Sequence, residues 1–375
     1  MKTTKTFARI AGVVLAGLLV FAFAGCQHDA STTNQHDAGT TSYTITYEFH
    51  DSVTSAGTTT INGTDYDLVY FGDFPQTVKA SDVSVNEAQS VTMGDLTYYY
   101  GSDGNYYAKQ SENAYDSSYT YSDGTTVAKS WANSEKYFKV EPIKWRVLNP
   151  SADGNKILVA ENILTANVAY YDYSNVNRTI SDATVYPNNY EHSKIRAYLN
   201  GLSYAVKASD SDDQTTDATY NGKGFLQTAF TESAQSLIAT TTVDNSAAST
   251  NPASNASTWN SGNNTYACEN TSDKIFLLSE KEATTSDYGF DEYNVYIGSS
   301  EGITTSSRVR QTTDFAKANY AYQNSTAGYG GWWWLRSPYC GDSRYARSIY
   351  SDGNADDIRR VDGKSGGVVP ALCVE

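Results

Sequence analysis

The chain has 375 residues, of which 42 are acidic and 27 are basic, so its formal net charge at neutral pH is −15. This acidity argues against nucleic acid and anionic membrane surfaces as partners, because both repel a negatively charged protein. Charged residues make up only 18% of the chain while tyrosine occurs 31 times, a profile that favours a secreted, β-rich surface protein over a cytosolic enzyme.

The N-terminus has the pattern of a bacterial export signal. Three basic residues among the first nine precede an apolar run, 10–25, that is too short to span a membrane comfortably. The run ends at Phe-Ala-Gly-Cys and resembles the bacterial lipobox, in which the cysteine is lipidated after cleavage. We therefore expect residues 1–25 to be a lipoprotein signal peptide and Cys26 to carry a lipid anchor in the membrane. An ordinary signal peptide or an uncleaved anchor is the alternative.

The rest of the chain is expected on the extracytoplasmic side of the bacterial cell envelope. Residues 26–42 have no apolar periodicity and are predicted to be a flexible tether. Residues 43–375 are predicted to form a single domain with polar insertions near 111–130, 209–221 and 243–264, although their number would also suffice for two domains.

Strand-like runs alternate with turn residues along this domain. The predicted strands are residues 43–49, 67–71, 96–100, 105–109, 140–148, 156–164, 275–278, 332–338 and 368–374. The third and fourth of them flank a Gly-Ser-Asp-Gly turn, which predicts a hairpin with Gly101 and Gly104 at positive φ.

Helical patterns are few and short. Ser193, Thr231 and Ser279 can each cap a helix, and Glu282 stands at capping-box spacing from Ser279. The chain is therefore predicted to be α+β, with a mainly antiparallel sheet and two or three short helices.

Three consecutive tryptophans near the C-terminus are costly to expose, so most of them should pack into a core. We expect Trp333 and Trp334, together with Trp145, to be structural. Arg336 follows in the same strand and is expected to pair with a buried acid or to stack on Trp334, in preference to binding a carboxylate ligand.

The loops after this strand, between residues 339 and 364, are the predicted binding surface. They are rich in Tyr, Asn, Asp and Arg, which are typical of adaptable binding sites, although the tyrosines could instead cover sheet edges. The candidate residues are Tyr339, Arg344, Tyr345, Arg347, Tyr350, Asp352, Asn354 and Asp356.

Catalytic and metal-binding patterns are weak. Of the four histidines only His50 and His192 lie outside the tether, and His192 directly precedes a predicted helix cap. The acidic run 210–217 fits a solvated loop better than a calcium site, and no nucleophile-elbow, zinc-helix or P-loop motif occurs. No catalytic residue, metal or cofactor is assigned.

Three cysteines remain once Cys26 is set aside. Cys340 follows the tryptophan strand and Cys373 lies in the last strand, so a disulfide between them is one interpretation in an oxidising envelope, and it leaves Cys268 over. Three buried thiols are the other interpretation.

Seven blocks in a fixed order carry a family resemblance. They are FGDFPQ at 71–76, EPIKWRVL at 141–148, SKIRAYLN at 193–200, FTE at 230–232, DKIFLLS at 273–279, WWLRSP at 333–338 and GVVPAL at 367–372. Together they resemble the domain of unknown function 6273, common in bacterial lipoproteins and surface proteins, over Tyr66–Glu375. The family usually has arginine where Val369 stands, so one salt-bridge donor is missing here.

The resemblance implies a C-type-lectin-like arrangement, similar to that of the sulfatase-modifying, formylglycine-generating group. It does not imply an activity, because a fold does not fix a function. Our preferred hypothesis is a lipid-anchored, non-enzymatic binding or adhesion module for an extracellular protein or glycan. The alternative is a thiol-dependent envelope enzyme of the formylglycine-generating type, for which Cys340 and Cys373 would be the reactive pair.

Overall fold

The computed structural model describes residues 48–148, 156–206, 215–217, 219–250, 264–290, 306–355 and 357–374. All of them belong to one compact unit, residues 45–375. The predicted signal peptide, Cys26 and the tether lie outside the described residues, as does nearly all of the predicted strand 43–49.

Within these residues the largest sheet has nine strands, and all of its pairings are antiparallel. The strands are β1 (Thr54–Ile61), β2 (Thr64–Val78), β3 (Val85–Met93), β4 (Leu96–Gly101), β5 (Tyr106–Ser111), β6 (Glu135–Val147), β7 (Lys156–Ala160), β15 (Ile275–Phe276) and β20 (Ala371–Val374).

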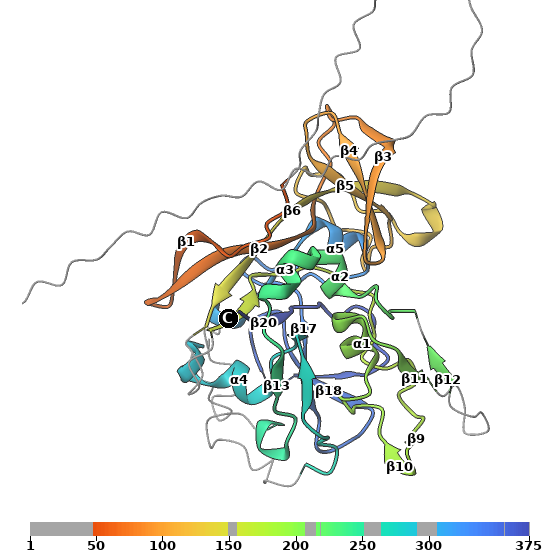
Figure 1. Ribbon diagram of the computed structural model, residues 1–375, viewed down its shortest axis with the longest axis vertical. Helices are drawn as coiled ribbons and strands as arrows, with labels where there is room; N and C mark the ends of the chain where they lie inside the picture. The colour runs from red at the N-terminus through yellow and green to blue at the C-terminus, as the bar shows by residue number, and fades with distance from the viewer. Residues whose placement is uncertain are drawn as a thin grey trace, which may run out of the picture. The chain divides into compact units, whose positions relative to one another are not determined.

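Strand β6 organises this sheet. One edge of β6 pairs with β2 along most of its length. Its other edge pairs first with β5, which leads to β4 and β3, and then with β7, which leads to β20 and β15. Figure 1 shows the first branch as the orange arm β3–β5, and it shows β20 of the second branch next to the C-terminus.

A separate three-stranded sheet is formed by the C-terminal strands β17 (Trp333–Pro338), β18 (Tyr345–Ile349) and β19 (Asp357–Arg360). Four two-stranded ribbons complete the strands of the described part of the chain. They are β9 (Arg178–Ile180) with β10 (Ala183–Val185), β11 (Tyr204–Val206) with β12 (Thr215–Asp217), β13 (Thr241–Val243) with β14 (Thr271–Asp273), and the parallel pair β8 (Asn162–Ile163) and β16 (Gln311–Thr312).

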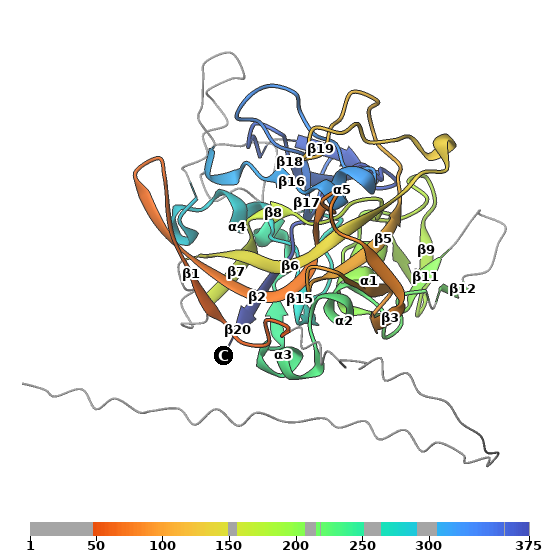
Figure 2. The ribbon, with the colours of Figure 1, turned by 90° about the horizontal axis from the view of Figure 1, so that it is seen from above.

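The helices are short. The α-helices are α1 (Lys194–Asn200), α2 (Phe225–Ala229), α3 (Glu232–Leu237), α4 (Glu280–Thr284) and α5 (Asp314–Ala318), and the 3₁₀ turns are η1 (Ser130–Ala132), η2 (Ala247–Thr250), η3 (Ser286–Tyr288) and η4 (Ser306–Arg308). Figures 1 and 2 show α1, α2 and α3 close together beside the large sheet. None of the helices among the described residues is long and apolar enough to cross a membrane.

The three predicted helix caps are confirmed. Ser193 accepts from the backbone N–H of Arg196 at the start of α1, and Thr231 does the same for α3. Ser279 and Glu282 form a complete capping box on α4. The α+β class is also confirmed, with two more helices, α2 and α5, than the caps predicted. Each has only five residues, too few to show a 3.6-residue period.

The predicted hairpin between β4 and β5 is present, but the expected role of one glycine was wrong. Gly104 has φ 87, whereas Gly101 is not in the left-handed region. A Cβ on Gly101 would lie 2.5 Å from the ring of Tyr107. Gly101 is therefore needed for close packing, and only Gly104 for the turn.

The core lies between the large sheet, the helices and the C-terminal strands. Trp145, Trp333 and Trp334 are fully buried. The indole N–H of Trp145 donates to the carbonyl of Phe71 at 2.7 Å, and the indole N–H of Trp333 donates to the carbonyl of Arg308 at 3.1 Å. The tryptophan strand therefore sits deep in the fold, which leaves its flanking residues to form surface.

Candidate functional site

The predicted binding surface is divided between the two ends of β18. Tyr345 begins this strand and Tyr350 directly follows its end, so the two residues are about 17 Å apart at roughly 3.3 Å per residue. Alternation along the strand also directs Arg347 and Tyr350 to opposite faces. The candidate residues therefore do not form one site, and Asp356 lies outside the described residues.

At the start of β18 the charged side chains are already paired. Arg344 is exposed and bridges to Asp342. Arg347 is buried, lies 3.1 Å from the carboxylate of buried Glu280, and stacks over the ring of Tyr339 at 5.1 Å. Arg347 is thus part of the interior, and its expected place on the binding surface was wrong.

Arg336 is likewise an interior residue. Its side chain is 2% exposed and it forms a two-pronged ion pair with Glu282. It also donates to the carbonyl of Leu277 at 2.8 Å and to that of Asp244 at 3.1 Å. The Glu282 carboxylate raises the pKa of Arg336 against the opposing effect of burial, so the guanidinium stays charged. This arginine fixes β17 to α4 and is not available to a ligand.

A pocket of about 200 Å³, which we call the aromatic pocket, extends along β18 from Tyr350 to Arg359 and Arg360. These two arginines of β19 pair with Ala346 and Tyr345 near the start of β18. The defining side chains of the pocket come from five separate segments, namely Tyr115 after β5, Tyr322 after α5, Trp332 before β17, Tyr350 after β18 and Arg359 on β19. Arg360, Gly363 and Ser365 complete the lining. Of the predicted surface residues, only Tyr350 lines this pocket, while Asp352 and Asn354 belong to the half-buried turn beyond it.

Arg359 is held at the centre of the aromatic pocket. Its guanidinium lies 5.1 Å from the ring centre of Trp332 and 5.2 Å from that of Tyr350. The side chain also donates to Asp357 at 2.8 Å and remains 35% exposed. Burial raises the pKa of the Asp357 carboxyl, although Ser348 and Arg359 hydrogen bond to it. Two ring contacts and one ion pair thus orient a guanidinium that a ligand can still reach.

The three tyrosines that line the pocket contact one another. The ring centres of Tyr115 and Tyr322 are 5.5 Å apart at 78°, and Tyr115 is 40% exposed. Burial raises the pKa of Tyr322, and so does its side-chain hydrogen bond with Tyr350. The hydroxyl of Tyr322 therefore stays protonated at neutral pH and can donate or accept hydrogen bonds.

Tyr320, a residue with a strained backbone, packs against one of the pocket tyrosines. Helix α5 ends at Ala318, and Tyr320, just past the C-cap Asn319, has φ 73. The N–H of Ala321 donates to the carbonyl of Ala316 at 2.9 Å. That hydrogen bond defines a helix end at which glycine is the usual left-handed residue, so a tyrosine there costs about 1–2 kcal/mol. The ring of Tyr320 packs 5.5 Å from that of Tyr115. A bulky residue kept at a position suited to glycine points to a role beyond stability.

Of the two interpretations of the cysteines, the structure has the one without a disulfide. Cys268, Cys340 and Cys373 are all thiols. Cys340 lies in the turn between β17 and β18, whereas Cys373 lies in β20 between its partners β15 and β7. Burial raises the pKa of Cys268 to about 11 and also raises that of Cys340. Both thiols therefore stay protonated at neutral pH, which gives no support to thiol-dependent catalysis.

The two histidines have structural surroundings. His50 contacts the buried carboxylate of Asp73 through both its backbone N–H, at 2.7 Å, and its ring, at 2.8 Å. His192 directly precedes Ser193, the N-cap of helix α1. Burial lowers the pKa of its imidazole, whereas the negative charge of Glu191 acts to raise it. Over the ranges that the structure describes, no set of three His, Cys, Asp or Glu side chains is placed to bind a metal ion.

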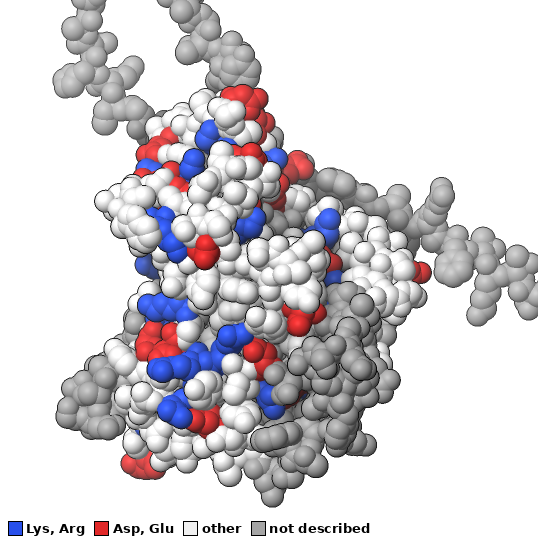
Figure 3. Space-filling view, turned by 180° about the vertical axis from the view of Figure 1, so that it is seen from behind, with Lys and Arg blue, Asp and Glu red and all other residues white. Residues whose placement is uncertain are grey.

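Positive and negative charges are interspersed on the surface. On the face shown in Figure 3, basic and acidic side chains lie next to one another and are separated by wide uncharged areas. No broad area of one sign is visible on the described atoms of this face. Such a surface does not favour a polyanion, which agrees with the acidic composition.

Sequence reasoning missed most of the aromatic pocket. Tyr115 lies in the tract 111–130, predicted as an insertion, and Tyr322 lies in a segment without any motif. Trp332 was predicted only as part of the strand 332–338, and its side chain is nearly buried at 4% exposure. The abundance of tyrosine was the one available indication, and it does not show which tyrosines meet in space.

The comparisons with known proteins reveal a family and nothing beyond it. A family model described as "Domain of unknown function (DUF6273)" matches residues 153–375. The match includes the last five of the seven sequence blocks and begins after the first two. No curated protein and no solved structure matches the chain. The C-type-lectin-like arrangement therefore stays a prediction.

Proposed function

The chain belongs to the family of the domain of unknown function 6273, and from that premise we propose that it is a lipid-anchored, non-enzymatic binding module of the cell envelope. The proposed ligand is an extracellular glycan that docks in the aromatic pocket. The observation that carries this proposal is the placement of Arg359 between Trp332 and Tyr350, beside two further tyrosines.

The chemistry of this lining suits a sugar. The C–H faces of a sugar ring pack on aromatic rings, and its hydroxyl groups hydrogen bond with the guanidinium of Arg359 and with tyrosine hydroxyls. Because Arg359 is already oriented by two rings and by Asp357, it loses little freedom when a ligand binds. The side chains that line the pocket include no carboxylate, imidazole or thiol, so tyrosine hydroxyls are the main groups there that could transfer a proton.

The anchor is supported by the sequence alone. The basic start, the short apolar run and the Phe-Ala-Gly-Cys tetrapeptide favour lipidation of Cys26. Mass spectrometry of the native N-terminus should find acyl chains on Cys26, and Cys26→Ser should release the protein from membranes. A native N-terminus without acyl chains would contradict the anchor and leave the pocket proposal untouched.

The binding proposal is tested by a glycan array probed with the chain from Tyr43 onward. We expect Tyr350→Ala to weaken binding to the array hits at least about tenfold, a loss of about 1.4 kcal/mol. Tyr345→Ala is the matched control, because Tyr345 does not line the pocket and alternation along β18 directs it to the face opposite Tyr350. Melting temperatures of both variants verify folding.

Three results would overturn the proposal. An array without hits argues against a glycan, and a parallel screen of envelope proteins would then test the other ligand class. Equal losses in both variants would show that the effect is not local to the aromatic pocket. A loss confined to Tyr345→Ala would place the ligand on the opposite face of β18.

A further inference from the structure

A second pocket, of about 130 Å³, shares no lining residue with the aromatic pocket. We call it the Asp95 pocket. Its side chains come from β2, the β3–β4 turn, β5, the segment after β8, helix α1, the segment before α2 and helix α5. The volume far exceeds the roughly 10–15 Å³ that one water needs, so the pocket has room for a small organic ligand.

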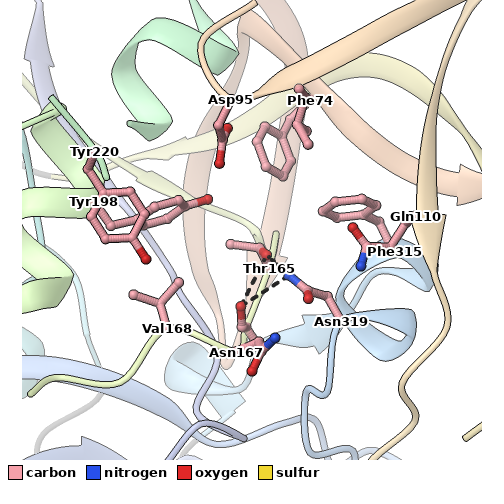
Figure 4. A pocket seen from close by; sticks show the side chains of 12 residues that line it. Phe74, Asp95, Gln110, Thr165, Asn167, Val168, Tyr198, Tyr220, Phe315 and Asn319 are labelled. Atoms are coloured by element: carbon pink, nitrogen blue, oxygen red, sulfur yellow. Dashed lines mark hydrogen bonds between the residues drawn. The ribbon is translucent and has the colours of Figure 1, made fainter. Parts of the chain in front are cut away.

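Two pairs of aromatic rings form opposite walls of this pocket. Phe74 and Phe315 lie on one side, with ring centres 5.6 Å apart at 88°. Tyr198 and Tyr220 lie on the other side, with ring centres 5.4 Å apart at 72°. Figure 4 shows open space between the two pairs. The phenylalanines and Tyr198 are nearly or fully buried, so these walls are fixed by the core.

Amide and hydroxyl groups lie on a third side. The amide of Asn319 donates to the hydroxyl of Thr165 at 2.8 Å and to the carbonyl of Ala166 at 3.1 Å. Asn167 is exposed, adopts φ 62, and lies beside them in Figure 4. These groups offer hydrogen bonds to the polar end of a ligand, and none of them carries a charge.

The only formal charge in this lining is negative. Asp95 stands on the exposed turn between β3 and β4, yet Figure 4 shows its carboxylate directed into the space between the aromatic pairs. One carboxylate oxygen accepts from the hydroxyl of Thr228 at 2.7 Å. No lysine, arginine or histidine lines the pocket, and no ion pair within the described part of the chain includes Asp95. The lining therefore combines one carboxylate with four aromatic rings and no cation, and the nearest basic influence on Asp95 comes from Lys223 outside the lining.

The geometry points to the Asp95 pocket as a binding site for a small organic ammonium ion. The cationic head lies between the two aromatic pairs and against the carboxylate of Asp95, since a desolvated cation is attracted by ring faces and by an opposite charge. The amides of Asn167 and Asn319 face the remainder of the ligand. This site is independent of the glycan proposal, because it rests on other residues and another chemistry.

The test uses choline as the probe and the full chain purified in a maltoside detergent, which contains no choline head group. Isothermal titration calorimetry compares choline with 3,3-dimethyl-1-butanol, which has the same shape without the charge. We expect choline to bind at millimolar concentration or below, and the neutral analogue to bind at least about tenfold more weakly.

The variants assign that binding to the pocket. Asp95→Asn keeps an oxygen for Thr228 and should weaken choline binding at least about tenfold. Asp82→Asn is the matched control, because it removes the same charge from an exposed position outside the pocket and should change nothing. Tyr220→Leu removes one half-buried ring and should also weaken choline binding, which keeps the test informative if Asp95→Asn does not fold.

Several outcomes would overturn the site. The wild-type protein could fail to bind choline at millimolar concentration, or could bind choline and its neutral analogue equally well. Asp95→Asn and Asp82→Asn could also weaken choline binding to the same extent. Undiminished choline binding by a folded Asp95→Asn or Tyr220→Leu protein would place the ligand elsewhere.

Discussion

At the scale of single residues, burial decides which charged pairs matter. The Arg336 side chain is 2% exposed, and its two terminal guanidinium nitrogens donate to the carboxylate of Glu282. Arg344, in contrast, pairs with Asp342 in solvent. Removing one partner of a buried pair leaves the other charge uncompensated, and removing one partner of an exposed pair does not. The two arginines, eight positions apart, should therefore respond very differently to the same substitution.

We expect Arg336→Leu to lower the free energy of unfolding by about 3–5 kcal/mol, because Glu282 and two carbonyls lose their donor. Arg344→Leu should leave it essentially unchanged. Urea denaturation of the chain from Tyr43 onward measures both. Similar effects of the two substitutions would show that Arg336 is not the structural residue that its contacts indicate.

Asp95 should lower the stability of the fold at neutral pH. Although the residue stands on an exposed turn, its carboxyl group is directed inward, and the desolvation there raises its pKa. The hydroxyl of Thr228 and nearby Lys223 partly offset this effect. The folded state therefore holds this proton more tightly than the unfolded state does. Its stabilising contribution is complete below the ordinary aspartate pKa of about 3.9 and is lost as pH rises through the raised value.

Asparagine has no proton to lose, so Asp95→Asn lacks this pH dependence. As pH rises from 4 to 7, the melting temperature of the variant should therefore increase relative to that of the wild type. Melting curves of both proteins across that range measure it. A difference that is constant with pH, or that shifts toward wild type, would contradict the environment described for Asp95. A variant that gains stability and loses choline would identify a binding group maintained at the expense of stability.

At the scale of elements, the ends of two helices can be compared directly. Helix α1 is followed by Gly201 at φ 68, and α5 is followed, after its C-cap Asn319, by Tyr320 at φ 73. In both, the N–H of the next residue donates to a carbonyl five positions earlier in the chain. A left-handed backbone favours glycine at this position, and only the end of α1 has it.

Gly201→Ala should destabilise the protein by about 1–2 kcal/mol, because alanine is strained at that φ. Tyr320→Gly should change the free energy of unfolding by less than about 1 kcal/mol, since relief of the same strain offsets the lost ring contacts and the greater freedom of glycine in the unfolded chain. It should nevertheless weaken glycan binding, because Tyr115 loses its neighbour. A large loss of stability in Tyr320→Gly would show that the tyrosine serves packing alone.

The elements also show how far the sequence could be read. Ser193, Thr231 and Ser279 were found because a cap is a local pattern, and the strand 140–148 was found because its residues alternate. The aromatic pocket could not be found in this way, because Tyr115 and Tyr350 are brought together only by the tertiary fold. Arg347 was misplaced for the same reason, since nothing near it in sequence indicates Glu280.

At the scale of the whole molecule, the family match and the structural unit have different boundaries. The matched residues 153–375 contain β7, β20 and β15, but β6, the next strand of the same sheet, lies before them. Trp145 on β6 is fully buried, and Phe71, Phe74 and Phe138 join it in the same core. The matched segment therefore lacks part of its own core and one edge of its own sheet.

We therefore expect residues 153–375 to be insoluble or unfolded when expressed alone. Four large apolar side chains contribute about 6–12 kcal/mol when buried, which is comparable with the entire stability of a domain, about 5–15 kcal/mol. The chain from Tyr43 onward should instead unfold in one cooperative transition. A protease site placed between residues 148 and 156 gives the matched control. After cleavage there, both pieces are present and every described strand pairing is intact, so the protein should stay folded. A cooperative melt of 153–375 alone would show that β6 is an addition to a complete domain, and would contradict the central place that its pairings give it.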